Sequence, residues 1–264
     1  MASAKNIRKR GAFLLPNLLT TGALFAGFYS IIAGINGHYE AAVIGVVVAG
    51  VLDGLDGRVA RLMNAQSDFG VEYDSLSDLV SFGLAPALLA FNWSLSTFSD
   101  LGPLAGKLGW LAAFLYAACA ALRLARFNTQ VDLADKRYFQ GLASPAAAGT
   151  LVATIWFFVD NGFTGAEVRV LIFAETVVLG LLMFSRIRYF SFKALPVTDR
   201  VPLTWLLLFV LLLVLLASDP PAVMTLIGVV YVASGIVVTI LGLRDRRTRR
   251  LRRRGGPDGP EDPP

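Results

Sequence analysis

Two pairs of aspartates lie within the stretch Leu52–Asp78, which reads LDGLDGRVARLMNAQSDFGVEYDSLSD in an otherwise apolar part of the chain. Asp53 and Asp56 are three residues apart, and Asp74 and Asp78 are four apart. Residues at these spacings lie on the same face of a helix, so each pair predicts two carboxylates that point the same way. A reversal of the chain between the pairs would bring all four carboxylates face to face.

The residues that accompany the first pair suit a phosphorylated ligand. At about 100° per residue, Gly57 and Ala60 share the helix face of the first two aspartates, and Arg61 lies just beyond it. The two small residues would leave clearance for a bulky phosphate group, and a guanidinium offers a fork of donors to phosphate oxygens. Gly70, between the two pairs, could supply the permissive backbone that a chain reversal needs.

Divalent cations are the predicted partners of these carboxylates, because four unpaired charges at a membrane-embedded site would be very costly. The available ligands are oxygens. Cys119 is the single cysteine and falls within an apolar run, and His38, the single histidine, falls in a short polar stretch. Oxygen ligands favour Mg²⁺, Mn²⁺ or Ca²⁺ over zinc or copper. Four bridging acids could hold two ions in the arrangement that serves in-line phosphoryl displacement.

Other interpretations of the aspartates remain open at this point. They could cap helices or pair with Arg58 and Arg61, although neither role explains the small residues and their spacing. They could form the ion site of a transporter, but such proteins typically carry broken helices in two related halves, and no internal repeat is visible in this sequence. An intramembrane prenyltransferase would also use paired aspartates with Mg²⁺, and the compact G-x2-A-R insertion argues against it.

The elements that must position these residues are membrane helices. Hydrophobic residues make up 55% of the 264 residues, and the mean hydropathy is +0.62. Apolar stretches of roughly 20 residues, the length that spans a bilayer, recur along the chain. We therefore predict an all-α, polytopic membrane protein with about eight transmembrane helices. The predicted spans are 11–37, 41–63, 79–99, 108–122, 141–159, 170–185, 201–218 and 220–243.

The basic residues are distributed asymmetrically among the predicted loops. If the N-terminus is cytoplasmic, all of the 24 Lys and Arg residues except Lys107 and Arg169 fall on the cytoplasmic side. Cytoplasmic loops carry such an excess, so we expect both termini and the aspartate site at the cytoplasmic face of the cell (inner) membrane. The N-terminal apolar run has no evident cleavage site and is predicted to be retained.

One membrane domain, residues 11–243, is predicted to precede a tail of residues 244–264 that is basic and then rich in Gly and Pro. The tail has no apolar face to bury, so we expect a short helical extension followed by disorder. Its arginines would anchor the last span on the cytoplasmic side or bind anionic lipid headgroups. Small residues in the spans would also permit a homodimer interface.

The aspartate stretch resembles a known family. Its residues match the signature D-x2-D-G-x2-A-R-x8-G-x3-D-x3-D of the CDP-alcohol phosphotransferases at every fixed position. The resemblance implies that the four aspartates bind two divalent ions, Mg²⁺ or Mn²⁺, and that Asp78 is also the general base. It further implies which residues lie against the CDP part of the donor, namely Asp53, Asp56, Gly57, Ala60 and Arg61.

Segments outside the signature resemble one branch of this family, the bacterial-type phosphatidylserine synthases. They are PNLLT at 16–20, DSLSDLVSFGLAPALL at 74–89, RLARFN at 123–128, YFQGLASPAAA at 138–148 and MFSRIRYFSFK at 183–193. The resemblance implies transfer of the phosphatidyl group from CDP-diacylglycerol to the hydroxyl of L-serine, with phosphatidylserine and CMP as products. Glycerol 3-phosphate, an inositol phosphate and choline remain alternative acceptors, because only the resemblance indicates serine.

Three polar residues follow the fourth predicted span. Arg123 and Arg126 are three apart, on one helix face, and Asn128 comes shortly after them. Long basic side chains at the end of a span commonly anchor it to the headgroup region. The alternative is that these residues bind a lipid phosphate or the carboxylate of serine, and the sequence leaves both roles open.

Overall fold

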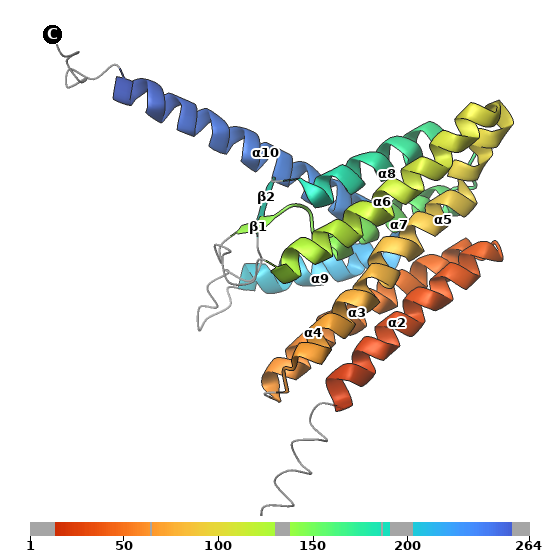
Figure 1. The fold of residues 1–264 in the computed structure, drawn as a ribbon, viewed down its shortest axis with the longest axis horizontal. Helices are drawn as coiled ribbons and strands as arrows, with labels where there is room; N and C mark the ends of the chain where they lie inside the picture. The colour runs from red at the N-terminus through yellow and green to blue at the C-terminus, as the bar shows by residue number, and fades with distance from the viewer. Residues whose placement is uncertain (1–13, 64, 130–137, 186, 191–202, 255–264) are drawn as a thin grey trace, which may run out of the picture.

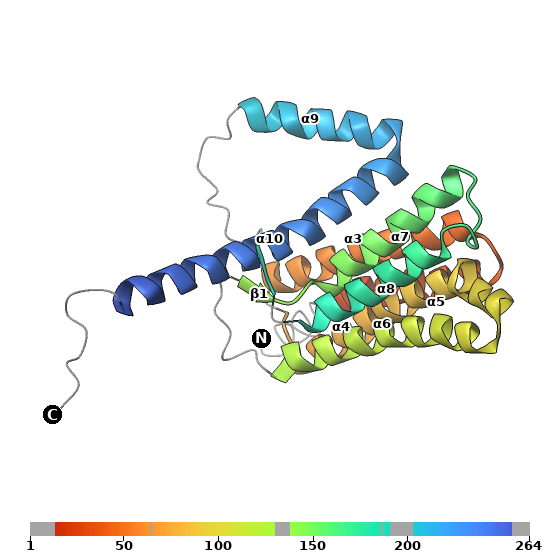
Figure 2. The ribbon, with the colours of Figure 1, turned by 90° about the horizontal axis from the view of Figure 1, so that it is seen from above.

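The computed structural model describes residues 14–63, 65–129, 138–185, 187–190 and 203–254. This part of the chain is a bundle of helices, with one pair of three-residue strands as its only other regular element. Helices α2 to α8 run side by side, and α9 and α10 stand to one side of them (Figure 1, Figure 2). The predicted all-α class is confirmed apart from those strands. The predicted segments at 11–13, 201–202 and 255–264 lie outside the described residues.

The first two helices form a hairpin, α2 (Leu14–Ile35) and α3 (Tyr39–Leu62), whose turn contains Gly37 at a φ of 77°. Both helices bury mainly Ala, Gly, Ser, Thr and Val side chains, which lets their backbones approach closely. Larger apolar side chains, such as Phe25 on α2 and Ile44 on α3, are exposed. This division between small inward and large outward side chains is typical of helices that face lipid.

The second aspartate pair lies on a long helical segment that is interrupted once. The segment consists of α4 (Asp68–Asp78), the π-helical turn η1 (Leu79–Leu84) and α5 (Ala85–Trp93). Pro86 has no N–H to bond the carbonyl of Phe82 four residues earlier, and its ring would clash with that carbonyl in a regular helix. The wider turn avoids the clash, and the hydroxyl of Tyr116 donates to the Phe82 carbonyl instead (3.3 Å).

The middle of the chain completes the bundle. It contains the 3-10 helix η2 (Leu95–Leu101), α6 (Pro103–Thr129), β1 (Tyr138–Gln140), α7 (Ser144–Asp160), α8 (Arg169–Phe184) and β2 (Arg188–Phe190). The strands pair antiparallel, with Phe139 opposite Tyr189. The entry to α7 and the exit from α8 are therefore joined at the end of the bundle where α6 ends.

The last two helices are α9 (Leu203–Ser218) and α10 (Pro220–Arg254). None of the α9 residues is buried, and its side chains are almost all large and apolar. α10 packs against α7 and β2 and continues as one helix into the arginine-rich segment that begins at Arg244. The predicted helical extension of the last span is thus present up to Arg254.

Four helical segments in the described part of the chain are long and apolar enough to cross a membrane. They are Leu14–Ile35, Asp68–Leu101, Pro103–Thr129 and Pro220–Val237, and Ser144–Asp160 and Leu203–Ser218 are shorter apolar helices. The structure therefore agrees with a helical membrane protein, and the count of eight spans remains a prediction. The helical segment that contains the predicted span 79–99 begins earlier, at Asp68.

Candidate active site

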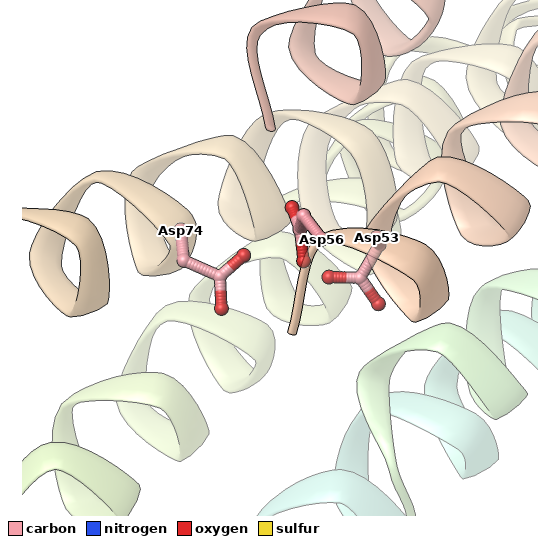
Figure 3. A group of neighbouring side chains, drawn as sticks. All are labelled: Asp53, Asp56 and Asp74. Carbon is pink, nitrogen blue, oxygen red and sulfur yellow. The ribbon is translucent and has the colours of Figure 1, made fainter. Parts of the chain in front are cut away.

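Three of the four aspartates converge where the end of α3 meets α4. Asp53, Asp56 and Asp74 each offer a carboxylate oxygen, and these three oxygens lie within 4.8 Å of one another. Figure 3 shows Asp74 reaching from α4 towards the two aspartates of α3. The predicted reversal of the chain therefore brings the two pairs face to face.

Asp78 lies one turn of α4 beyond Asp74, at the edge of this group. Its carboxyl is in hydrogen-bond contact with that of Asp53, but it is not one of the three acids whose oxygens cluster. Asp78 also interacts electrostatically with Arg123 on α6. The fourth aspartate thus lies between the acid cluster and a basic side chain, in a different environment from the other three.

The cluster has the chemistry of a site for a divalent cation. Its ligands are carboxylate oxygens, which suit hard cations such as Mg²⁺ and Mn²⁺. Oδ1 of Asp74 is buried and has no hydrogen-bond partner among the described residues. A buried carboxylate oxygen without a partner is costly, and a bound cation would remove that cost. The residues present therefore fit a divalent metal.

Thr20 on α2 holds one of these carboxylates in place. Its hydroxyl donates to Oδ2 of Asp56 over 2.7 Å, and both residues are buried. The backbone carbonyl of Thr20 in turn accepts a hydrogen bond from the hydroxyl of Ser77 on α4 (3.2 Å). Because Asp56 is bonded to a neutral hydroxyl, this structure does not support the alternative in which Arg58 or Arg61 neutralises it. Thr20 was not predicted as a site residue, although it ends the PNLLT segment.

A cavity of about 420 Å³ adjoins the cluster. It is lined by Pro16, Asn17 and Thr20 of α2, by Asp56, Gly57, Ala60 and Arg61 of α3, by Ala65, Gln66 and Ser67 of the connection, and by Asp68, Gly70, Val71 and Asp74 of α4. The signature residues predicted to contact a nucleotide donor, except Asp53, thus surround one cavity. Asn17, Gln66 and Ser67 were not predicted, because Asn17 lies outside the signature and the other two occupy its variable positions.

Gly57 and Gly70 contribute to this cavity in different ways. A side chain at Gly57 would meet nothing closer than Arg61, 3.7 Å away, so its helix face is open to a ligand as predicted. The prediction that Gly70 supplies a chain reversal is wrong. Gly70 lies in the first turn of α4, where its N–H donates to the capping hydroxyl of Ser67 (3.0 Å). A Cβ there would lie 3.1 Å from that hydroxyl and 3.6 Å from Oδ1 of Asn17, so close packing is the role of this glycine.

Arg123 is the basic residue of α6 that interacts electrostatically with Asp78. One of its terminal nitrogens, Nη1, donates to the hydroxyl of Ser144 at the start of α7 (2.7 Å). Its Nε is buried and has no hydrogen-bond partner in the described part of the chain. Because of the interaction with Asp78, a side chain whose buried N–H donor has no partner among the described residues acts on the carboxyl at the edge of the cluster.

Arg126 and Asn128 make other contacts. Arg126 donates to the carbonyls of Phe184 (3.2 Å) and Ser185 (3.4 Å), and its guanidinium lies 5.6 Å from the centre of the Phe184 ring. It therefore caps the end of α8. Asn128 bonds to the hydroxyl of Ser75 on α4 (3.0 Å). These contacts tie α6 to α8 and to α4, as expected for residues that hold helices together.

The structure thus defines a helical membrane protein with a carboxylate site for divalent cations beside a cavity that could hold a phosphorylated ligand. The family model of the CDP-alcohol phosphatidyltransferases matches residues 13–182. The chain therefore belongs to the CDP-alcohol phosphatidyltransferase family, as its signature indicated. The matched region extends from the start of α2 almost to the end of α8 and contains every residue of the acid cluster and the cavity.

Several relatives carry one name, CDP-diacylglycerol–serine O-phosphatidyltransferase. The relative from Helicobacter pylori is 37% identical over 206 residues, which cover 78% of this chain and 81% of the relative. The relative from Bacillus subtilis is 34% identical over 179 residues, which cover 68% of this chain and 91% of the relative. The relative from Mycobacterium leprae is 38% identical over 147 residues, which cover 54% of this chain and 46% of the relative.

Proposed function

We propose that this protein transfers the phosphatidyl group of CDP-diacylglycerol to the hydroxyl of L-serine, giving phosphatidylserine and CMP. One observation carries the proposal: the residues of the family signature come together as a cluster of carboxylates that could bind a cation and as the wall of the adjoining cavity. Serine as the acceptor is supported by the relatives, since proteins similar to most of this chain are named for that reaction. Another acceptor alcohol would require the same donor site but a different acceptor pocket.

In this proposal the cavity receives the CDP part of the donor, while the acyl chains remain in lipid. Gly57 and Ala60 leave room for the phosphates against α3, and Arg61 lies where it can donate to their oxygens. Asp53, Asp56, Asp74 and Asp78 would hold two divalent ions, Mg²⁺ or Mn²⁺. When bound, these ions would neutralise phosphate charge and stabilise the charge that develops during in-line phosphoryl displacement.

Asp78 is the proposed general base. It lies next to Asp53 on one side and Arg123 on the other, so an acceptor that reaches it would also meet the phosphate side of the cluster. Asp78 takes the proton of the serine hydroxyl as its oxygen attacks the phosphorus that bears the diacylglycerol. The new P–O bond replaces the bond to the CMP oxygen, CMP leaves with that electron pair, and Asp78 later returns the proton to solvent.

Arg123 is the proposed anchor for the carboxylate of serine. Its buried Nε has no partner in the described part of the chain, Ser144 fixes one of its terminal nitrogens, and its charge interacts electrostatically with Asp78. A guanidinium with free donors matches a carboxylate well. Arg126 and Asn128, the other candidates, are engaged in contacts between helices, and we assign them a structural role.

We further propose the membrane arrangement predicted from the sequence. The domain at 11–243 would form eight spans in the cell (inner) membrane, with both termini and the active site on the cytoplasmic side. The asymmetric distribution of Lys and Arg supports this orientation, as does the water-soluble acceptor. The exposed apolar surface of α9 leaves room for lipid or for a second copy in a homodimer.

One experiment tests the reaction. Purified protein in mixed micelles would receive CDP-diacylglycerol and a panel of alcohols, and the release of CMP would be followed with and without EDTA. We expect release with serine, and loss of that release in EDTA. Release with glycerol 3-phosphate in place of serine would overturn the acceptor assignment, and release that persists in EDTA would overturn the metal site.

A further inference from the structure

The last helix reaches the candidate site although it lies outside the region that matches the family, residues 13–182. α10 packs along α7 and also contacts β2, beside the start of α7, where Ser144 bonds Arg123. Figure 2 shows α10 passing this end of the bundle before its arginine-rich segment continues beyond it. The helix is therefore placed to contribute to the acceptor side of the site.

α10 and α7 approach each other closely at Gly228. A Cβ at this position would lie 2.6 Å from Oγ1 of Thr150 and 3.0 Å from its Cβ and Cγ2. Thr150 cannot easily move away, because it is 3% exposed, its hydroxyl donates to the carbonyl of Ala146 (2.8 Å), and a β-branched side chain has few rotamers in a helix. Only glycine at position 228 allows the two helices to approach this closely.

The contact at Gly228 determines where Tyr231 lies. It is three residues after Gly228 and therefore lies on the same face of α10, about 4.5 Å further along the axis. On α7, which runs in the opposite direction, Ser144 lies about 9 Å from Thr150 towards the same end. Tyr231 thus lies at a level between them, packed against the buried core, and its phenol interacts electrostatically with Arg123.

We propose that Tyr231 is a positioning residue for Arg123, and that α10, docked through Gly228, completes the subsite that receives the carboxylate of the acceptor. The inference deepens the proposed function and rests on it. Arg123 is held by Ser144 at one terminal nitrogen and interacts electrostatically with Asp78. The phenol oxygen of Tyr231 can accept from the guanidinium on the α10 side, and the buried Nε, which has no partner in the described part of the chain, is then available to an incoming anion.

The first test removes only the phenol hydroxyl. Tyr231→Phe keeps the ring that packs on the core, and Tyr29→Phe, on an exposed tyrosine of α2, is the matched control. We expect the KM for serine to rise about tenfold in Tyr231→Phe, the size of effect of one hydrogen bond to a charged group. The KM for CDP-diacylglycerol and kcat should stay within about twofold, since the donor lies on the far side of Asp78.

The second test moves the whole helix. Gly228→Ala places a methyl group against Thr150, whereas Gly149→Ala on α7 meets nothing within 4 Å and serves as control. We expect Gly228→Ala to raise the KM for serine as Tyr231→Phe does. Adding Thr150→Ala should restore much of the affinity, because it removes two of the three atoms in conflict. If Gly228→Ala only destabilised the fold, adding Thr150→Ala would not specifically restore the affinity for serine.

The outcomes separate the two proposals. If the unmodified protein releases no CMP with serine, the proposed function fails, and the inference about α10, which rests on it, fails with it. If the unmodified protein is active with serine, and both Tyr231→Phe and Gly228→Ala keep its KM for serine, the inference about α10 is overturned while the function stands. Mg²⁺-dependent thermal stabilisation by CDP-diacylglycerol, measured without serine, reports independently that each variant is folded and binds the donor.

Discussion

Thr20 on α2 donates its hydroxyl hydrogen to the carboxylate of Asp56 on α3 over 2.7 Å, although the two residues are 36 positions apart in the chain. The bond fixes one carboxylate oxygen and leaves the other available to the cluster. Thr20 also joins the hairpin of α2 and α3 to α4, because its backbone carbonyl accepts a hydrogen bond from the hydroxyl of Ser77. The orientation of the acid cluster therefore depends on a helix that carries no acid of its own in its described part.

Replacing Thr20 by Val should weaken the response to metal. The variant keeps the shape of the side chain but removes the hydroxyl, so Asp56 loses the bond that orients it. We expect the concentration of Mg²⁺ needed for half-maximal CMP release to rise about tenfold. Thr20→Ser should behave like the unmodified protein. Thr225→Val is the control, since the Thr225 hydroxyl donates to the carbonyl of Pro221 within α10, and an equal effect there would contradict the prediction.

Asp78→Asn should abolish turnover while donor binding persists. The amide cannot take the proton of the serine hydroxyl, so the rate of CMP release should fall by at least about a hundredfold. Binding of CDP-diacylglycerol in the presence of Mg²⁺ should remain measurable by its thermal stabilisation. Asp100→Asn, an exposed acid at the other end of the bundle, should have full activity. Full activity of Asp78→Asn would refute its assignment as the base.

Asp74→Asn should stabilise the metal-free protein and inactivate the enzyme. Its carboxylate lies within 4.8 Å of two others and has a buried oxygen without a partner, so removing the charge removes repulsion in EDTA. We expect Tm in EDTA to rise by about 2–4 °C, and the additional rise caused by Mg²⁺ to shrink. Asp160→Asn, an exposed acid at the end of α7, should leave both quantities unchanged. A lower Tm of Asp74→Asn in EDTA would show that the cluster is stable without metal.

Gly70→Ala should reduce activity through packing alone. The added Cβ would lie 3.1 Å from the Ser67 hydroxyl that caps α4, so the cap and the cavity wall must shift. We expect a severalfold rise in the KM for CDP-diacylglycerol and a loss of about 1 kcal/mol in stability. Gly54→Ala on α3 has nothing within 4 Å and should be neutral or slightly stabilising, because Ala favours a helix. Equal effects at the two positions would exclude this explanation.

Arg123→Lys should impair the acceptor rather than the donor. Lysine keeps the charge but loses the planar fork that Ser144 holds at one end. We expect the KM for serine to rise about tenfold, with the KM for CDP-diacylglycerol little changed. Serine amide, which has no carboxylate, should be a poor acceptor for the unmodified protein and no worse for the variant. If Arg123→Lys penalised both acceptors alike, the carboxylate would not be the group that it binds.

The aspartate site could be predicted because its information is local. The spacing of Asp53 with Asp56 and of Asp74 with Asp78 fixes which face of each helix carries the acids, and a short connection makes the two faces meet. The hydrophobic composition predicted helices in a membrane for a similar reason. Each of these predictions depends only on residues that are close together in the sequence.

The partners of the site could not be predicted in the same way. Thr20, Ser144 and Tyr231 come from three other helices, and no spacing rule relates them to Asp56 or Arg123. The start of α4 was missed although a local signal exists, because Ser67 followed by Asp68 is a typical helix N-terminus. Gly70 was given the wrong role because a glycine between two helices suggests a turn, whereas here it lies inside the first helical turn.

The π-helical turn Leu79–Leu84 has a consequence for how this chain can vary. A wider turn takes up an extra residue, and each residue advances a helix by about 100°. The turn therefore sets the phase between the acids of α4 and the packed face of α5. Removing a single residue from this turn would rotate one face against the other, and no side-chain substitution could correct that. The active site should thus depend on the number of residues between Leu79 and Leu84 independently of which side chains they carry.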